Sequence, residues 1–167
     1  MSVTDEALKA NETYAENFTD GALPLPPAKK LAIVACMDAR IIPDQILGLG
    51  NGDAHVIRNA GGIVSEDALR SLVISHHLLG TQEFIIINHT DCGMLTVDED
   101  NLVKKLRKET GITPDDPVHF HAFTDLEANV RQQINRLKSH PWIPDSISIR
   151  GFIYDVHTGN LNEVVSG

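Results

Sequence analysis

The chain has 167 residues, of which 42% are hydrophobic and 22% are charged, a composition typical of one folded domain with a substantial core. Its formal net charge of −9 argues against a nucleic-acid-binding surface. No apolar run approaches the roughly 20 residues that a membrane-spanning helix needs, and the acidic, polar N-terminus lacks the features of a signal peptide. We therefore expect a cytoplasmic protein with no nucleic-acid or membrane partner.

The N-terminal segment is predicted to form a helical arm followed by an extended linker. Residues 3–18 have helical character, with Thr4 as a candidate cap, but they carry too few large apolar side chains for a core helix. We expect this helix to pack on a partner subunit. Prolines at positions 24, 26 and 27 forbid a helix in the linker. The chain is accordingly divided into an arm, residues 1–28, and a main domain, residues 29–167.

In the main domain, short apolar runs alternate with helical patterns. Strands are predicted at residues 31–35, 54–58, 83–88, 146–154 and 161–164. Helices are predicted at residues 43–49, 65–79, 98–110 and 125–137, with Ser65 as the cap of the second. This alternation predicts an α/β fold, in which a mainly parallel central sheet is covered by helices on both faces.

The two cysteines of the chain both lie where predicted strands end. Cys36 follows the first strand, and His89 and Cys92 follow the third. Ligands bind beyond the carboxyl ends of parallel strands where the strand order reverses, so these side chains meet if the first strand lies between the second and third. Two thiolates and one imidazole form a zinc site with a fourth position open for water. The alternative interpretation is that both cysteines are small buried hydrophobic residues.

Asp38 and Arg40 lie two and four residues after Cys36. Alone, such a pair is usually a solvated ion pair of little energetic value. Beside a metal, however, an ionised carboxylate only accepts hydrogen bonds, and the permanently charged guanidinium lowers its pKa. We expect Arg40 to hold Asp38 as an anion that orients a zinc-bound hydroxide. If the pair breaks, Asp38 is expected to become the fourth zinc ligand and close the site.

Three motifs, in this order, resemble those of the β-class carbonic anhydrases. They read Cys36-Met37-Asp38-Ala39-Arg40, Arg58-Asn59-Ala60-Gly61-Gly62 and His89-Thr90-Asp91-Cys92-Gly93. The resemblance spans residues 30–165 and is to the compact branch of the family. It implies that Zn²⁺ is bound by Cys36, His89 and Cys92, and that Asp38 and Arg40 form the catalytic dyad. In the same interpretation, the backbone amide of Gly93 contacts the substrate.

The resemblance also implies an activity and an assembly. The activity is the reversible hydration of carbon dioxide to bicarbonate and a proton, by attack of zinc-bound hydroxide on the carbon. The compact branch includes enzymes that hydrolyse carbonyl sulfide or carbon disulfide, so the alternative is release of hydrogen sulfide and carbon dioxide at the same zinc site. A third, non-enzymatic hypothesis is a zinc-dependent oligomer or sensor in which Asp38 stays on the metal. The family forms homodimers, often paired into tetramers, with an N-terminal helix that embraces the neighbour.

Two further residues near these motifs have open roles. Arg58 is either an anion contact near the site or a member of an ion pair that fixes its turn. Asp91 is expected to hydrogen-bond within its own turn.

Overall fold

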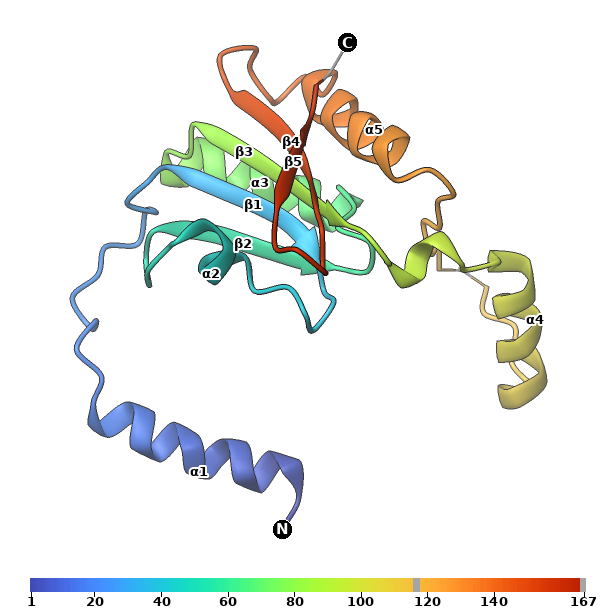
Figure 1. Cartoon of the computed structure of the whole chain (residues 1–167), viewed down its shortest axis with the longest axis horizontal. Helices are drawn as coiled ribbons and strands as arrows, with labels where there is room; N and C mark the ends of the chain where they lie inside the picture. Colours follow the sequence, from blue (N-terminus) through green and yellow to red (C-terminus); the bar gives the residue numbers. More distant parts are fainter. Residues whose placement is uncertain (116–117, 166–167) are drawn as a thin grey trace.

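The computed structural model of the chain describes residues 1–115 and 118–165. Its centre is a five-stranded sheet in the order β2-β1-β3-β4-β5 (Figure 1). The strands are β1 (Leu31–Cys36), β2 (Ala54–Asn59), β3 (Glu83–His89), β4 (Ser148–Tyr154) and β5 (Leu161–Val164). The first four are parallel, and β5 pairs antiparallel with β4. The structure thus confirms an α/β fold with a mainly parallel sheet, in which the first strand lies between the second and third.

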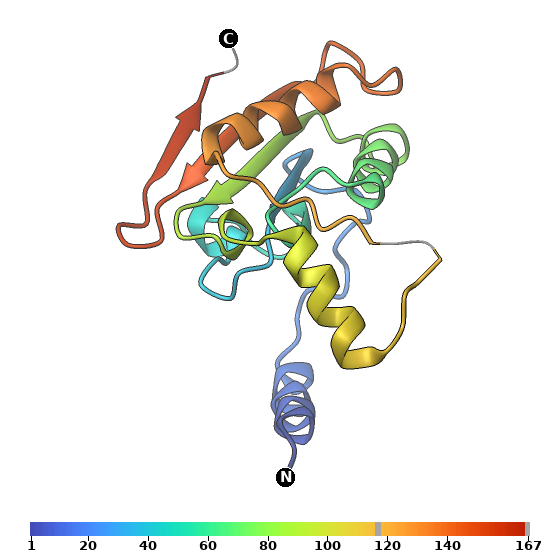
Figure 2. The same ribbon diagram turned by 90° about the vertical axis from the view of Figure 1, so that its right-hand side faces the viewer.

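Helices lie on both faces of this sheet, but they cover the faces unequally. The helices are α1 (Val3–Glu16), α2 (Pro43–Leu47), α3 (Glu66–Leu79), α4 (Glu99–Thr110) and α5 (Leu126–Lys138). The long helices α3 and α5 cover one face, and the short α2 packs on the other (Figures 1 and 2). Among the described residues, no helix is long and apolar enough to cross a membrane.

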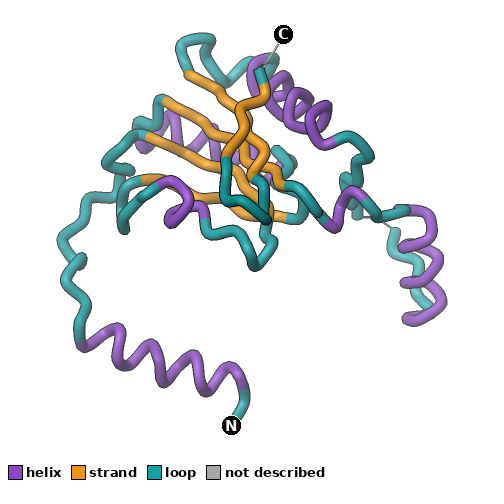
Figure 3. The backbone as a smooth tube through the Cα atoms, in the orientation of Figure 1, coloured by secondary structure: helices purple, strands orange, loops and turns teal. Residues whose placement is uncertain are grey.

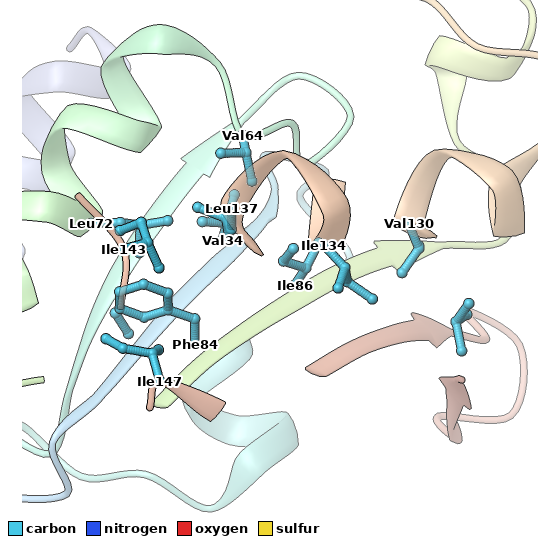
Figure 4. Close-up of a cluster of buried hydrophobic side chains, with 12 residues drawn as sticks. Val34, Val64, Leu72, Phe84, Ile86, Val130, Ile134, Leu137, Ile143 and Ile147 are labelled. Carbon is cyan, nitrogen blue, oxygen red and sulfur yellow. The ribbon is translucent and has the colours of Figure 1, made fainter. Parts of the chain in front are cut away.

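Strand β1 is buried on both sides because its residues alternate between two apolar clusters. Ala32 and Val34 face the larger cluster, which contains side chains from α3 and α5 (Figure 4). Ile33 and Ala35 face the smaller cluster, which includes Leu47 of α2. A strand buried on both faces has a continuous apolar sequence rather than an alternating one, and this is the pattern from Leu31 to Cys36. The packing fixes the end of β1, where the first cysteine lies.

The helix boundaries depend on local capping. Ser2, and not Thr4, caps α1, because the Ser2 hydroxyl accepts a hydrogen bond from the Asp5 backbone and the Asp5 carboxylate accepts one from the Ser2 backbone. This reciprocal pair is a capping box. Ser65 caps α3 as predicted. Helix α2 ends two residues early, because Gly48 adopts the left-handed conformation that terminates helices.

The N-terminal arm stands apart from the sheet. An extended linker separates α1 from β1 (Figure 3), and no residue of α1 is buried. Leu8, Tyr14 and Phe18 expose 61%, 59% and 47% of their surfaces. Such a helix gains nothing from packing within its own chain, so its contact with a partner subunit stays a prediction.

Candidate metal centre

The structure brings the three predicted ligands together. The ligand atoms of Cys36, His89 and Cys92 all lie within 4.8 Å of one another. Cys36 and His89 are the last residues of the neighbouring strands β1 and β3. Cys92 follows a tight turn in which Asp91 has a φ of +56°. All three side chains are buried, with at most 4% of each residue exposed, and both cysteines are free thiols.

The orientation of His89 favours metal binding. Its Nδ1 lies 2.8 Å from the carbonyl oxygen of Thr90, so Nδ1 carries the proton and Nε2 carries a lone pair. The segment around Thr90 is itself fixed, because its backbone N–H donates to the carbonyl of Tyr154 and its hydroxyl accepts from the Val156 backbone. Within residues 1–115 and 118–165, Nε2 is the buried side-chain nitrogen or oxygen that has no hydrogen-bond partner. A buried polar atom without a partner is costly, and a metal ion removes that cost.

The two thiols interact strongly. A hydrogen bond from Cys92 to Cys36 lowers the pKa of Cys36 far below that of an ordinary thiol and raises the pKa of Cys92. Hydrogen bonds from the backbone N–H groups of Asp38 and Gly61 also lower the pKa of Cys36, and one from that of Met94 lowers the pKa of Cys92. A second negative charge is unfavourable in this buried pair unless a cation compensates it. Two thiols and a free imidazole nitrogen therefore fit a borderline divalent metal ion.

Asp38 lies beside this cluster and is held by Arg40. Arg40 donates from Nε to Asp38 Oδ1 at 2.9 Å and from Nη2 to Oδ2 at 2.8 Å. These side-chain hydrogen bonds hold the pKa of Asp38 well below its usual range. Asp38 Oδ2 lies 3.9 Å from His89 Nε2. The carboxylate is thus bonded to Arg40 through both oxygens and lies beside the Cys₂His cluster.

Asp91 is a second carboxylate partner of Arg40, which the sequence pattern does not indicate. Its Oδ2 accepts from Arg40 Nη1 at 2.7 Å, and its carbonyl oxygen accepts from Nη2 at 3.0 Å. Asp91 was expected to bond within its own turn, and its side chain reaches instead across to a residue 51 positions earlier. Arg40 and Asp91 follow the neighbouring parallel strands β1 and β3. Their shared position at the strand ends is the feature of the sequence that could have predicted this contact.

Arg58 binds backbone carbonyls, and among the described residues it has no ion-pair partner. Its Nε donates to the carbonyl of Cys36 at 3.1 Å, and its Nη2 donates to the carbonyl of Asp38 at 2.7 Å. These bonds fix the backbone on both sides of Met37. Arg58 therefore shapes the loop that carries the first thiol and the carboxylate.

Gly93 is exposed at the start of a 3₁₀ helix, Gly93–Leu95, directly after Cys92. A Cβ atom built at this glycine would meet no described atom within 4 Å. The backbone at this position is therefore open to an approaching molecule. The neighbouring side chains are apolar: Ile41 is buried with the two cysteines, and the residues packed against them are Ile46, Met94, Leu95, Phe123 and Tyr154.

Comparison with known proteins agrees with this geometry. A family model described as carbonic anhydrase matches residues 31–161. The chain belongs to the β-carbonic anhydrase family. It is 49% identical to Beta-carbonic anhydrase 1 of Mycobacterium tuberculosis, over 98% of this chain and 99% of that protein. It is also 37% identical to a carbon disulfide hydrolase of Acidithiobacillus thiooxidans, over 82% of this chain and 78% of that protein.

A solved structure extends the likeness to three dimensions. The carbonic anhydrase of Streptococcus mutans superposes with a TM-score of 0.91 at 44% identity, covering 99% of each chain. This family member therefore has the family fold over its whole described length, including the N-terminal arm.

Metal binding to this cluster should depend on pH. Zn²⁺ binds thiolates, so each thiol that is still protonated must release its proton to the solvent. The apparent affinity is therefore expected to fall as the pH falls, and a Zn²⁺ titration in weak buffer should acidify the solution. A chelator-competition titration at several pH values measures this. The Cys92→Ser variant should bind at least about tenfold more weakly, and pH-independent binding would contradict the thiolate site.

Proposed function

We propose that this protein is a zinc enzyme that hydrates carbon dioxide reversibly to bicarbonate and a proton. One observation carries the proposal: an ionised carboxylate, Asp38, is held through both oxygens by Arg40 beside a buried Cys₂His donor set. A purely structural zinc site has four protein ligands and does not need such a carboxylate. The 49% identity to Beta-carbonic anhydrase 1 over nearly the whole chain supports the same activity.

When bound at Cys36, His89 and Cys92, Zn²⁺ would supply the Lewis acidity that brings the pKa of a coordinated water toward neutrality. The protein's part is to orient the reacting groups. As an anion, Asp38 only accepts hydrogen bonds, so it selects an O–H donor at its side of the site and fixes where that oxygen's lone pair points. Arg40 keeps the carboxylate ionised and in one rotamer, because two of its nitrogens bind the two oxygens of Asp38.

The surroundings suit a small, linear, apolar substrate. The two thiols are buried among apolar side chains, so hydrogen bonds and charges beside them act at a dielectric below that of bulk water. We infer that the backbone N–H of Gly93 donates to the substrate oxygen on which negative charge develops. The missing side chain at Gly93 leaves the room that this approach requires.

We propose that Asp38 also controls access to the fourth ligand position. While Arg40 holds it, the position is free; once released, Asp38 is close enough to occupy it. Protonation of Asp38 does not trigger this release near neutral pH, because Arg40 keeps the Asp38 pKa well below its usual range. The competing partner is Asp91, which shares Nη2 of Arg40 with Asp38. Closure therefore requires rearrangement of Arg40 rather than titration of Asp38.

The Asp38→Asn variant tests the central role of this carboxylate. Asparagine keeps the shape of the aspartate side chain but is neutral, so Arg40 no longer holds an anion at this position. We therefore expect a loss of roughly 100-fold in kcat/KM from lost orientation. Zinc content should stay unchanged. Stopped-flow measurement of carbon dioxide hydration provides the readout. The matched control is Asp67→Asn, which removes the exposed ion pair of Asp67 with Arg70 and should leave kcat/KM unchanged.

Full activity of Asp38→Asn would remove Asp38 from the mechanism. If the zinc-loaded wild type fails to hydrate carbon dioxide, sulfide release from carbonyl sulfide and carbon disulfide is the next measurement. The 37% identity to a carbon disulfide hydrolase favours that alternative. Inactivity on all three substrates would favour the non-enzymatic hypothesis.

We also propose that the protein is a cytoplasmic homodimer or dimer of dimers, with α1 packed on the partner. A reducing compartment keeps both cysteines available as ligands. Strand β2 is an edge strand of the sheet, and exposed edges are commonly covered or paired. The apolar side chains of α1, none of which is buried, provide the surface for the contact.

Substitution on the arm tests this assembly. Tyr14 and Phe18 form a ring contact with centroids 5.6 Å apart, and the Tyr14→Ser/Phe18→Ser double variant removes this apolar surface without touching the sheet. We expect weaker self-association, measured by light scattering after size-exclusion chromatography over a concentration series. Glu12→Ser/Glu16→Ser, within α1, is the control. Unchanged association of the first variant would contradict the proposal.

A further inference from the structure

A chain of buried side-chain amides lies behind the candidate metal centre. It consists of Asn88, on β3 directly before His89, and of Asn129 and Gln133 on α5. Helix α5 packs against β3 and β4 (Figure 2). The three residues expose 1%, 5% and 5% of their surfaces. Buried amides are costly unless they are hydrogen-bonded, and neither the proposed catalysis nor the apolar core accounts for three of them in a row.

The hydrogen bonds of this amide chain run in a single direction. At one end, the Val64 N–H donates to Gln133 Oε1 at 2.9 Å. Gln133 Nε2 then donates to Asn129 Oδ1 at 3.0 Å, and Asn129 Nδ2 donates to Asn88 Oδ1 at 2.6 Å. The far end, Asn88 Nδ2, donates to the carbonyls of Gly61 and Gly62 at 3.0 and 3.2 Å.

Because a backbone donor fixes one end and backbone acceptors fix the other, each amide has one orientation that satisfies all its partners. If any one amide rotates by 180°, like groups face each other at both of its contacts. The amide chain therefore couples the position of the Gly61-Gly62 turn to the position of α5.

That turn adjoins the first thiol. A hydrogen bond from the backbone N–H of Gly61 is one cause, after the larger effect of Cys92, of the lowered pKa of the Cys36 thiol. Gly61 and Gly62 both have left-handed φ values, +82° and +62°, which side chains rarely adopt. A Cβ atom at Gly62 would lie 2.9 Å from the Cys36 nitrogen and from Asn88 Nδ2. The turn is thus held tightly between the strand that carries Cys36 and the amide chain.

We propose that Asn129 and Gln133 are positioning residues for the metal centre: through Asn88 they hold the Gly61 N–H on the sulfur of Cys36. The inference rests on the proposed metal site. It assigns to α5 a role in metal affinity, although no residue of α5 is a proposed metal ligand. Groups outside the ligand set that hydrogen-bond to metal ligands commonly change metal affinity by about 10–100-fold when they are lost.

The test measures the N–H···S hydrogen bond itself. Cadmium-113 replaces zinc in thiolate sites, and an amide that donates to a cadmium-bound sulfur shows a scalar coupling to the metal in the NMR spectrum. We expect the Gly61 amide of the cadmium-loaded wild type to show this coupling. In Asn129→Leu, which is similar in shape but has neither donor nor acceptor, the coupling should disappear. Zn²⁺ affinity, measured by chelator competition, should fall about tenfold.

The matched control is Asn135→Leu. Asn135 lies on the same helix and lines the same surface hollow of about 520 Å³ as Asn129, but it is exposed and has no bond in the amide chain. This control should keep both the Gly61 coupling and the wild-type affinity. If Asn129→Leu does not fold, Asn129→Asp decides the matter by the same readouts, because aspartate still accepts from Gln133 but cannot donate to Asn88 when ionised.

The outcomes separate the possible failures. Loss of the Gly61 coupling together with weaker Zn²⁺ binding supports the positioning role. A folded Asn129 variant that keeps both the Gly61 coupling and the Zn²⁺ affinity overturns the positioning role. This holds even if the melting temperature of the variant falls, because the amide chain then serves stability alone. Failure of the wild type to bind cadmium or zinc overturns the proposed metal site instead.

Discussion

Two thiols and one unpartnered imidazole nitrogen are buried together at the carboxyl ends of β1 and β3. This arrangement is unfavourable without a cation, because a buried polar atom lacks a partner and a second thiolate would add negative charge at low dielectric. Parallel pairing of the two strands fixes the relative positions of Cys36 and His89, and the turn after β3 adds Cys92. The apolar clusters on both faces of β1 keep that strand in register. The chemistry of the site thus depends on how the sheet is packed.

Arginine side chains organise the polar edge of the site, and they do so by geometry more than by binding energy. Arg40 is substantially exposed, so its ion pairs contribute little to stability. Its planar donors nevertheless fix Asp38 and the turn at Asp91 in one arrangement. Arg58 fixes the intervening backbone through two carbonyl groups. Reactive groups must be held within fractions of an ångström, and these bonds restrict the loop that carries the thiol and the carboxylate.

The sequence alone predicted the sheet and the grouping of Cys36, His89 and Cys92, because both depend on short-range patterns. Apolar runs that end at Cys36 and His89 mark strand ends, and parallel strand ends gather at one edge. The contact of Asp91 with Arg40 was missed because it depends on a left-handed turn residue. The amide chain was missed for a different reason. Asn129 and Gln133 lie in a helical pattern whose polar positions usually face solvent, and only the packing of α5 on β3 shows that they are buried.

The most direct test of this account is X-ray absorption spectroscopy of the zinc-loaded protein at the zinc edge. The proposed Cys₂His centre predicts two sulfur ligands at about 2.3 Å and two nitrogen or oxygen ligands at about 2.0–2.1 Å. Such a shell corresponds to Cys36, Cys92, His89 and one further light ligand. A shell without sulfur, or one with four sulfur atoms shared between chains, would contradict the metal centre on which the proposed function depends.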